Sequence, residues 1–324
     1  MDSTIIDFLY IYGSLLFLLI IFNPRSEFSI ALVIITCIRL FCIGTRTSLG
    51  SDIENYTAVL SQCDLSSINA QEFFWQLACL PSTYLSDIFP YPFFWIAALD
   101  CLLFVLIAYL GGLRVAALHD LTYLLSNSMG AIRQALAMKI MLAAVLLYVS
   151  HRKKQNFLAY LAVLATPLVH LASVVPVAMM QFMRSGVVMR VVLIATVLLF
   201  SYMLVDEALL SKLMFYVEFE GFRSTQDIYL SWIKRILIIL SSLTLTISNN
   251  IYWQFYSVGL VLAAAEFQVP EIAVRLGAYF EQFEVLLISA PMKPRLCRIG
   301  IAWYVLTAVV YTSRYMINIG LLNR

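Results

Sequence analysis

An arginine and a glutamine, Arg133 and Gln134, stand where a short polar stretch gives way to a long apolar run. A helix that begins here presents free backbone N–H groups and the positive end of its dipole, and both favour an anion. The planar guanidinium of Arg133 adds a charge that can hold a phosphate through two hydrogen bonds. The pattern predicts an anion site at the start of this helix. The alternative is an arginine that reaches out to lipid headgroups.

Lys139 lies deeper in the same apolar run. A charged side chain inside a membrane helix is costly, so it usually pairs with another group or lines a functional cavity. The simpler expectation is an ion pair with a carboxylate of another helix, such as Asp100.

A second polar pattern follows Pro270, a residue suited to the start of a helix. Its members recur at intervals of four, four and three residues and form one stripe on an apolar helix: Glu271, Arg275, Tyr279 and Gln282. A stripe of this length inside a membrane helix predicts a cavity beside it. An ion pair between Glu271 and Arg275, one helical turn apart, is the alternative.

Two further groups of polar residues stand at the ends of apolar segments. The stretch GTRTSLGSDIENY (44–56) supplies Arg46, Asp52 and Tyr56 directly after an early apolar run. His170 comes three residues after Pro167, which ends or kinks a helix. An imidazole titrates in the range that suits a general base, so His170 is a candidate for that role. A histidine that only satisfies local structure is the alternative.

Several kinds of motif are absent from the sequence. There is no DxD pair, no HExxH and no cluster of histidines and cysteines, so we predict neither a metal nor another cofactor. There is also no GxSxG and no P-loop, which argues against a serine hydrolase and an ATP-driven pump. The remaining chemistry comes from arginines, hydroxyl and amide groups and one histidine. That set suits a phosphate or pyrophosphate carried on a lipid.

The composition predicts an all-α, polytopic integral membrane protein. Of the 324 residues, 62% are hydrophobic and 12% are charged, against roughly 25% charged residues in soluble domains. No stretch has the composition of a soluble domain, so we expect one membrane domain over 1–324. The net charge of +2 gives no reason to expect a nucleic-acid partner.

Apolar segments long enough to cross or enter a bilayer recur along the whole chain. They cover 5–22, 27–43, 93–111, 114–128, 131–149, 157–182, 187–205, 228–247, 251–268, 271–289 and 299–319. An aromatic-rich helix at 70–89 is expected at the membrane interface. We therefore predict about 10–12 transmembrane helices.

Basic residues set the expected orientation, because lysine and arginine accumulate in cytoplasmic loops. They cluster at HRKK (151–154), MRSGVVMR (183–190) and MKPRLCR (292–298). All three clusters are cytoplasmic only if 157–182 enters the membrane and returns, as a re-entrant hairpin broken near Pro167. A single kinked span is the alternative. With the hairpin, the candidate residues are all expected on the outer face.

The six cysteines are scattered and form no CxxC pair. We expect them to be small apolar side chains. A disulfide between Cys63 and Cys79 on the oxidising side is the alternative.

The order of these pieces along the chain resembles the EpsG-type branch of the Wzy polysaccharide polymerases. The resemblance is carried by R-x(3–5)-G-[ST]-D-x-x-x-Y, a glutamate opening an aromatic segment, IRQ-x-LA, a later histidine, and R-x-x-x-YF. In this sequence they are Arg46, Gly50, Ser51, Asp52 and Tyr56; Glu72; Ile132, Arg133, Gln134, Leu136 and Ala137; His170; and Arg275, Tyr279 and Phe280.

The resemblance implies a metal-independent glycosyltransferase of the bacterial inner membrane. It would join repeat units of O-antigen, capsule or exopolysaccharide, carried on undecaprenyl pyrophosphate, at the periplasmic face. It also implies a chain-length regulator and a flippase as partners in the same pathway.

The resulting hypothesis gives each candidate residue a role. Arg133 and Arg275 stabilise the departing pyrophosphate, with Arg46 and Arg223 as further contacts. His170, or else Asp52, accepts the proton of the attacking sugar hydroxyl. The other substrate contacts are Tyr56, Glu72, Gln134 and Tyr279.

Three other functions compete with this one. An O-antigen ligase uses the same chemistry but is favoured by a large outer loop, which this chain lacks. A flippase of lipid-linked oligosaccharide binds pyrophosphate without a base and needs charged residues reachable from both sides. A purely structural membrane subunit does not need the buried polar stripe.

Overall fold

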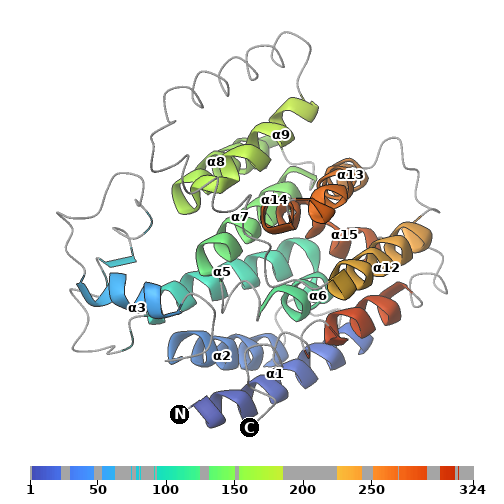
Figure 1. Ribbon diagram of the computed structural model, residues 1–324. Helices are drawn as coiled ribbons and strands as arrows, with labels where there is room; N and C mark the ends of the chain where they lie inside the picture. The colour runs from blue at the N-terminus through green and yellow to red at the C-terminus, as the bar shows by residue number, and fades with distance from the viewer. Residues whose placement is uncertain are drawn as a thin grey trace. The chain divides into compact units, whose positions relative to one another are not determined.

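The structure is a computed structural model (Figure 1). It describes residues 2–22, 30–46, 53–62, 74, 78–79, 81, 91, 93–124, 131–149, 153–184, 225–242, 251–268, 270–289, 300–310 and 313. Every regular element within these ranges is a helix, so the all-α prediction is confirmed for them. The sites predicted at Asp52, Glu72 and Arg223 and the segment 187–205 lie outside these residues, as does most of the segment 70–89.

The fold divides into two compact units. Unit 1 comprises Met1–Leu171 and Ile301–Arg324, and unit 2 comprises Ala172–Gly300. The single membrane domain over 1–324 stays a prediction.

Unit 1 contains the helices of the N-terminal half of the chain. They are α1 (Asp2–Phe22), α2 (Ile30–Gly44), α3 (Ile53–Gln62), α5 (Phe94–Gly111), α6 (Leu113–Tyr123), α7 (Ile132–Val149) and α8 (Lys153–Val169). A C-terminal apolar helix, Gly300–Val310, joins this unit from Ile301 onward. Its Tyr304 hydroxyl accepts a hydrogen bond of 2.7 Å from Thr122 of α6.

Helix α5 lies at the centre of unit 1, where it packs against α2, α6 and α7. The side chain of Asp100 in its first half meets Lys139 of α7, and Gly111 at its end lies against Leu146 of α7. The two helices therefore run in the same direction. Gly44 at the end of α2 lies against Phe94 at the start of α5, so α2 runs the opposite way.

Two features shape the connections around α5 and α7. Gly112, between α5 and α6, has a φ of 89°, a left-handed value that a residue without a Cβ adopts readily. Helix α8 packs against α7 and begins four residues after α7 ends. So short a link between packed helices makes them antiparallel neighbours.

Large apolar side chains are exposed on several helices of unit 1. Examples are Tyr10 of α1, Ile30 of α2, Leu102 of α5 and Phe157 of α8. Among the residues that the structure describes, two helices are long and apolar enough to cross a membrane by length and composition: Phe94–Gly111 and Ile132–Val149. Four shorter apolar helices accompany them: Phe8–Ile21, Ile30–Gly44, Phe157–Val169 and Gly300–Val310. Exposed apolar surface on apolar helices suits a lipid environment.

The predicted interruption near Pro167 is present in the structure. Helix α8 contains Pro167 and ends at Val169, and a 3-10 turn, η3 (Leu171–Ser173), precedes α9 (Val174–Arg184). Proline has no N–H for the carbonyl of Val163, and the Thr166 hydroxyl donates to that carbonyl instead at 2.6 Å. The re-entrant hairpin stays a prediction.

Unit 2 contains α9, α12 (Thr225–Ser242), α13 (Ile251–Ala264), η5 (Ala265–Phe267), α14 (Pro270–Glu281) and α15 (Glu284–Ser289). Helices α13 and α14 come close at Gly259, where an added Cβ would lie 3.2 Å from the backbone nitrogen of Glu281. A glycine at this position allows the two backbones to approach.

The helix expected over 271–289 is wrong as one continuous element, because it is broken after Glu281. The N–H of Phe283 donates to the carbonyl of Phe280 at 3.2 Å, so the carbonyl of Tyr279 loses its usual helical partner. The side-chain amide of Gln282 donates to that carbonyl at 3.0 Å. Gln282, the last residue of the predicted polar stripe, therefore lies outside the regular helix, and its side chain is buried.

The four cysteines that the structure describes are of two kinds. Cys37, Cys42 and Cys101 are free thiols. Cys79 is disulfide-bonded, so the expectation of six small apolar side chains is wrong for this residue.

Candidate active site

Arg46 stands directly after α2 and is almost completely buried. The N–H of Thr45 still donates to the carbonyl of Phe41 at 3.0 Å, so helical geometry continues up to the residue before it. The guanidinium carbon of Arg46 lies 4.9 Å from the centroid of the Phe93 ring, within the range of a cation–π contact. Arg46 is therefore placed beside the start of α5.

Arg133 and Gln134 occupy the first turn of α7, where the sequence predicted them. Arg133 is half-buried and Gln134 is buried. Because α7 runs parallel to α5, its first turn lies at the same end of unit 1 as Phe93. Arg46 and Arg133 therefore share one end of this unit.

His170 follows the last residue of α8 and is half-buried. Its backbone N–H donates to the carbonyl of Thr166 at 2.9 Å. Since α8 runs antiparallel to α7, its end returns toward the start of α7. His170 thus belongs to the same end of unit 1 as Arg133.

The other candidate residues that the structure describes lie on α3 and α14. Tyr56 is buried in α3 of unit 1. Arg275, half-buried, and Tyr279, fully buried, lie on α14 of unit 2. The structure therefore groups Arg46, Arg133, Gln134 and His170 within unit 1 and Arg275 and Tyr279 within unit 2.

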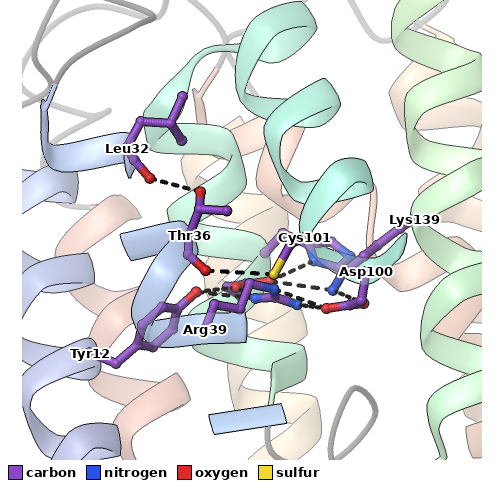
Figure 2. A network of polar contacts seen from close by, with 9 residues as sticks. Tyr12, Leu32, Thr36, Arg39, Asp100, Cys101 and Lys139 are labelled. Atoms are coloured by element: carbon purple, nitrogen blue, oxygen red, sulfur yellow. Dashed lines mark hydrogen bonds and ion pairs between the residues drawn. The ribbon is translucent and has the colours of Figure 1, made fainter. Parts of the chain in front are cut away.

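A buried network of charged side chains lies deeper in unit 1 (Figure 2). Asp100 of α5 accepts hydrogen bonds from Arg39 of α2 and Lys139 of α7. The Arg39 Nε lies 2.9 Å from Oδ2 of Asp100, and the Lys139 Nζ lies 2.6 Å from Oδ1. All three side chains are buried, so their charges meet away from water. The predicted pairing of Lys139 with Asp100 is confirmed.

The network continues to α6 and α1 through Asp120. Its carboxylate pairs with Arg39 and accepts a hydrogen bond from the Tyr12 hydroxyl. That hydroxyl also accepts a hydrogen bond of 3.1 Å from Nη1 of Arg39, and Lys139 lies 3.7 Å from Asp120. Two cations and two carboxylates thus connect four helices, with the tyrosine adding a fifth.

Reasoning from the sequence missed Arg39 and Asp120. The available signal was a lone arginine within the apolar run 27–43, which marks an intramembrane charge. Its partners lie 61 and 81 positions later, so the sequence alone does not identify them.

Unit 2 has buried ion pairs of its own around the break between α14 and α15. Arg235 of α12 pairs with Glu281 and with Glu266, the latter at 2.5 Å. The neighbouring Lys234 pairs with Glu284 at 2.9 Å. Two successive cations of α12 therefore hold the carboxylates on either side of the break.

The end of unit 1 that carries Arg46, Arg133 and His170 favours binding of an anion. Two guanidinium groups and the first turn of a helix gather there, and each favours negative charge. Among the residues that the structure describes, no group of three histidine, cysteine or acidic side chains is placed to hold a metal ion. A reaction without a metal stays a prediction.

The model of the EpsG family matches residues 29–321. The chain belongs to the EpsG family. Neither a curated protein nor a solved structure matches it. Membership of the EpsG family, together with the apolar helices, makes the chain a membrane protein of polysaccharide-polymerase type.

Proposed function

We propose that the chain joins oligosaccharide repeat units carried on undecaprenyl pyrophosphate into O-antigen, capsule or exopolysaccharide. The observation that carries this proposal is the gathering of Arg46, Arg133 and His170 at one end of unit 1 in a member of the EpsG family. Cations at this end suit the pyrophosphate of the lipid carrier.

The reaction is a displacement at C1 of the sugar that links the growing chain to its lipid. A hydroxyl of the incoming repeat unit forms the new C1–O bond, and the bond from C1 to the pyrophosphate oxygen breaks. Undecaprenyl pyrophosphate leaves with the bonding electron pair. Arg133 and Arg46 stabilise the charge that develops on the departing oxygen, with Arg275 and Arg223 as further candidates. Loss of one such donor typically lowers the rate by about 10²–10³.

The attacking hydroxyl loses a proton, which requires an acceptor within hydrogen-bond reach. His170 is the first candidate and Asp52 the second. The substrate contacts expected of Tyr56, Glu72, Gln134 and Tyr279 belong to the same proposal.

The orientation of the site is also part of the proposal. We infer that this end faces the periplasm of a bacterial inner membrane. The basic clusters at 151–154, 183–190 and 292–298 support this orientation through the positive-inside rule. The disulfide at Cys79 supports it as well, because such bonds persist in oxidising compartments.

The deciding experiment supplies purified protein in nanodiscs with the undecaprenyl pyrophosphate-linked repeat unit and EDTA. We expect a ladder of products at multiples of one repeat. Arg133→Ala should reduce it by about 10²-fold or more. Arg114→Gln is the matched control, because Arg114 lies at the opposite end of α5 and donates to the carbonyl of Ile20 at 3.0 Å. Its ladder should equal that of the wild type.

Other outcomes of this assay identify the competing functions. Binding of the lipid-linked sugar without any ladder indicates a flippase, and transfer only to lipid A core indicates a ligase. If His170→Ala and Asp52→Ala both retain full activity, neither residue is the base.

A further inference from the structure

The two carboxylate oxygens of Asp100 each hold a cation from a different helix. Oδ2 accepts from Arg39 of α2, and Oδ1 accepts from Lys139 of α7. Helix α5, which carries Asp100, packs against both of these helices. Figure 2 shows Arg39 and Lys139 converging on this one carboxylate. Asp100 is thus a link between α2 and α7.

Measured along the helix axes, Asp100 lies at nearly the same distance from Arg46 as from Arg133. Arg46 follows Arg39 by seven residues, and Arg133 precedes Lys139 by six. At a rise of about 1.5 Å per residue, Arg46 and Arg133 stand about 10 Å and about 9 Å from the level of the link. Because α2 and α7 run in opposite directions, both offsets point to the same end.

The contact between Arg46 and Phe93 supports this geometry independently. Phe93, the residue before α5, precedes Asp100 by seven residues and so lies about 10 Å from the link as well. The guanidinium carbon of Arg46 is 4.9 Å from its ring, as equal offsets on α2 and α5 require.

The link and the apolar packing together constrain the axial position of α7. The buried side chains of α7 include small ones, such as Ala135 and Ala143, and large ones, such as Leu136 and Leu142. A hydrogen bond of 2.6 Å to a buried carboxylate is directional and is lost if α7 slides by one residue, about 1.5 Å.

We propose that Asp100 is a positioning residue. It fixes the axial register of α2 against α7, so that Arg46 and Arg133 reach one pyrophosphate together. This inference rests on the proposed function and adds to it a residue that never touches the substrate.

The test is a double-mutant cycle between the link and the arginine that it positions. The linked pair is replaced by apolar residues of similar size, Asp100→Leu with Lys139→Met, which leaves Arg39 opposite Asp120 and the charges balanced. Binding of undecaprenyl pyrophosphate without sugar is measured in nanodiscs for wild type, this pair variant, Arg133→Ala and the combination. We expect the pair variant to lose about tenfold or more in affinity, and Arg133→Ala to cause little further loss in that background.

Three controls separate positioning from general damage. Lys139→Arg keeps the link and should keep the affinity. The matched pair Lys234→Met with Glu284→Leu removes a buried ion pair of unit 2 and should leave the affinity unchanged. Each variant is also checked for a single sharp peak in gel filtration after heating, so that unfolded protein is not scored as weak binding.

The outcomes distinguish the two proposals. If wild type forms a ladder of repeats and the pair variant binds the lipid as wild type does, the positioning role is wrong and the polymerase proposal stands. Independent, multiplicative losses from the pair variant and Arg133→Ala also overturn the positioning role. If wild type neither forms a ladder nor binds the lipid, the polymerase proposal itself is wrong.

Discussion

Four buried charged residues in unit 1, two cations and two carboxylates, balance one another. Arg39 and Lys139 face Asp100 and Asp120, and each side chain is essentially inaccessible. Buried charges of this kind are tolerated when every one has a partner, and removing a single partner is strongly destabilising. The cluster therefore behaves as one group rather than as separate ion pairs.

The first prediction concerns Asp100→Asn. The change leaves Arg39 and Lys139 with Asp120 as their one carboxylate in the cluster, so we expect a loss of about 3–5 kcal/mol in the free energy of unfolding. Thermal unfolding of the detergent-solubilised protein measures the effect. Asp100→Leu with Lys139→Met keeps the charges balanced and should stay much closer to wild type. Equal stability of Asp100→Asn and wild type would contradict the clustered description.

The sequence predicts individual charged residues better than it predicts their partners. Lys139 stood out because it lies too deep in its helix to reach headgroups, and Asp100 was the carboxylate of a neighbouring apolar segment. Arg39 carried the same signal, but the identity of its partners depends on how α2, α5 and α6 pack. That packing arises from contacts between distant parts of the chain.

Glycine allows two helices to pack closely where their backbones meet. At Gly259 of α13, an added Cβ would lie 3.2 Å from both the backbone nitrogen of Glu281 and the Cβ of Phe280. Gly13 of α1 offers the opposite case, because nothing lies within 4 Å of its added Cβ.

The second prediction compares these two glycines. Gly259→Leu should force α13 and α14 apart and lower the free energy of unfolding by about 1–3 kcal/mol. Gly13→Leu should be close to neutral, since there is room for the side chain. Thermal unfolding of both variants in the same detergent makes the comparison. Equal melting temperatures would show that α14 accommodates the larger residue.

The ends of helices were predictable where a residue type signals them. The runs 93–111 and 131–149 correspond closely to α5 and α7, and Pro167 marked the interruption before η3. The break after Glu281 has no such signal, because no proline or glycine stands between Ala278 and Leu287. It depends on Gln282 satisfying a carbonyl and on Lys234 and Arg235 of another helix holding Glu284 and Glu281.

Unit 1 has two distinct ends at the scale of the whole molecule. Arg46, Arg133 and His170 belong to one end. Arg114 and the end of α7, which HRKK follows, belong to the other. The sequence could predict this separation, because the direction of successive helices follows from short links and from the charge rule. It could not predict the contacts between helices that place Arg46 and Arg133 at nearly equal axial distances from Asp100.

The third prediction tests the orientation of these two ends. Ala131→Cys and Val149→Cys place a thiol at each end of α7. In intact spheroplasts, a membrane-impermeant maleimide should label Ala131→Cys above the level of the unchanged chain. Val149→Cys should react only after the membrane is permeabilised. The opposite pattern would place the candidate site in the cytoplasm.

The charge cluster also has a consequence for how the protein is made. Synthesis proceeds from the N-terminus, so Arg39 is made 61 residues before Asp100. An arginine at the centre of a membrane helix costs about 2.5–3.5 kcal/mol on translocon-insertion scales. We therefore expect α2 to remain in or beside the insertion machinery until α5 and α6 bring their carboxylates. Lys139 is the last of the four charged residues to be made, so docking of α7 completes the charge cluster.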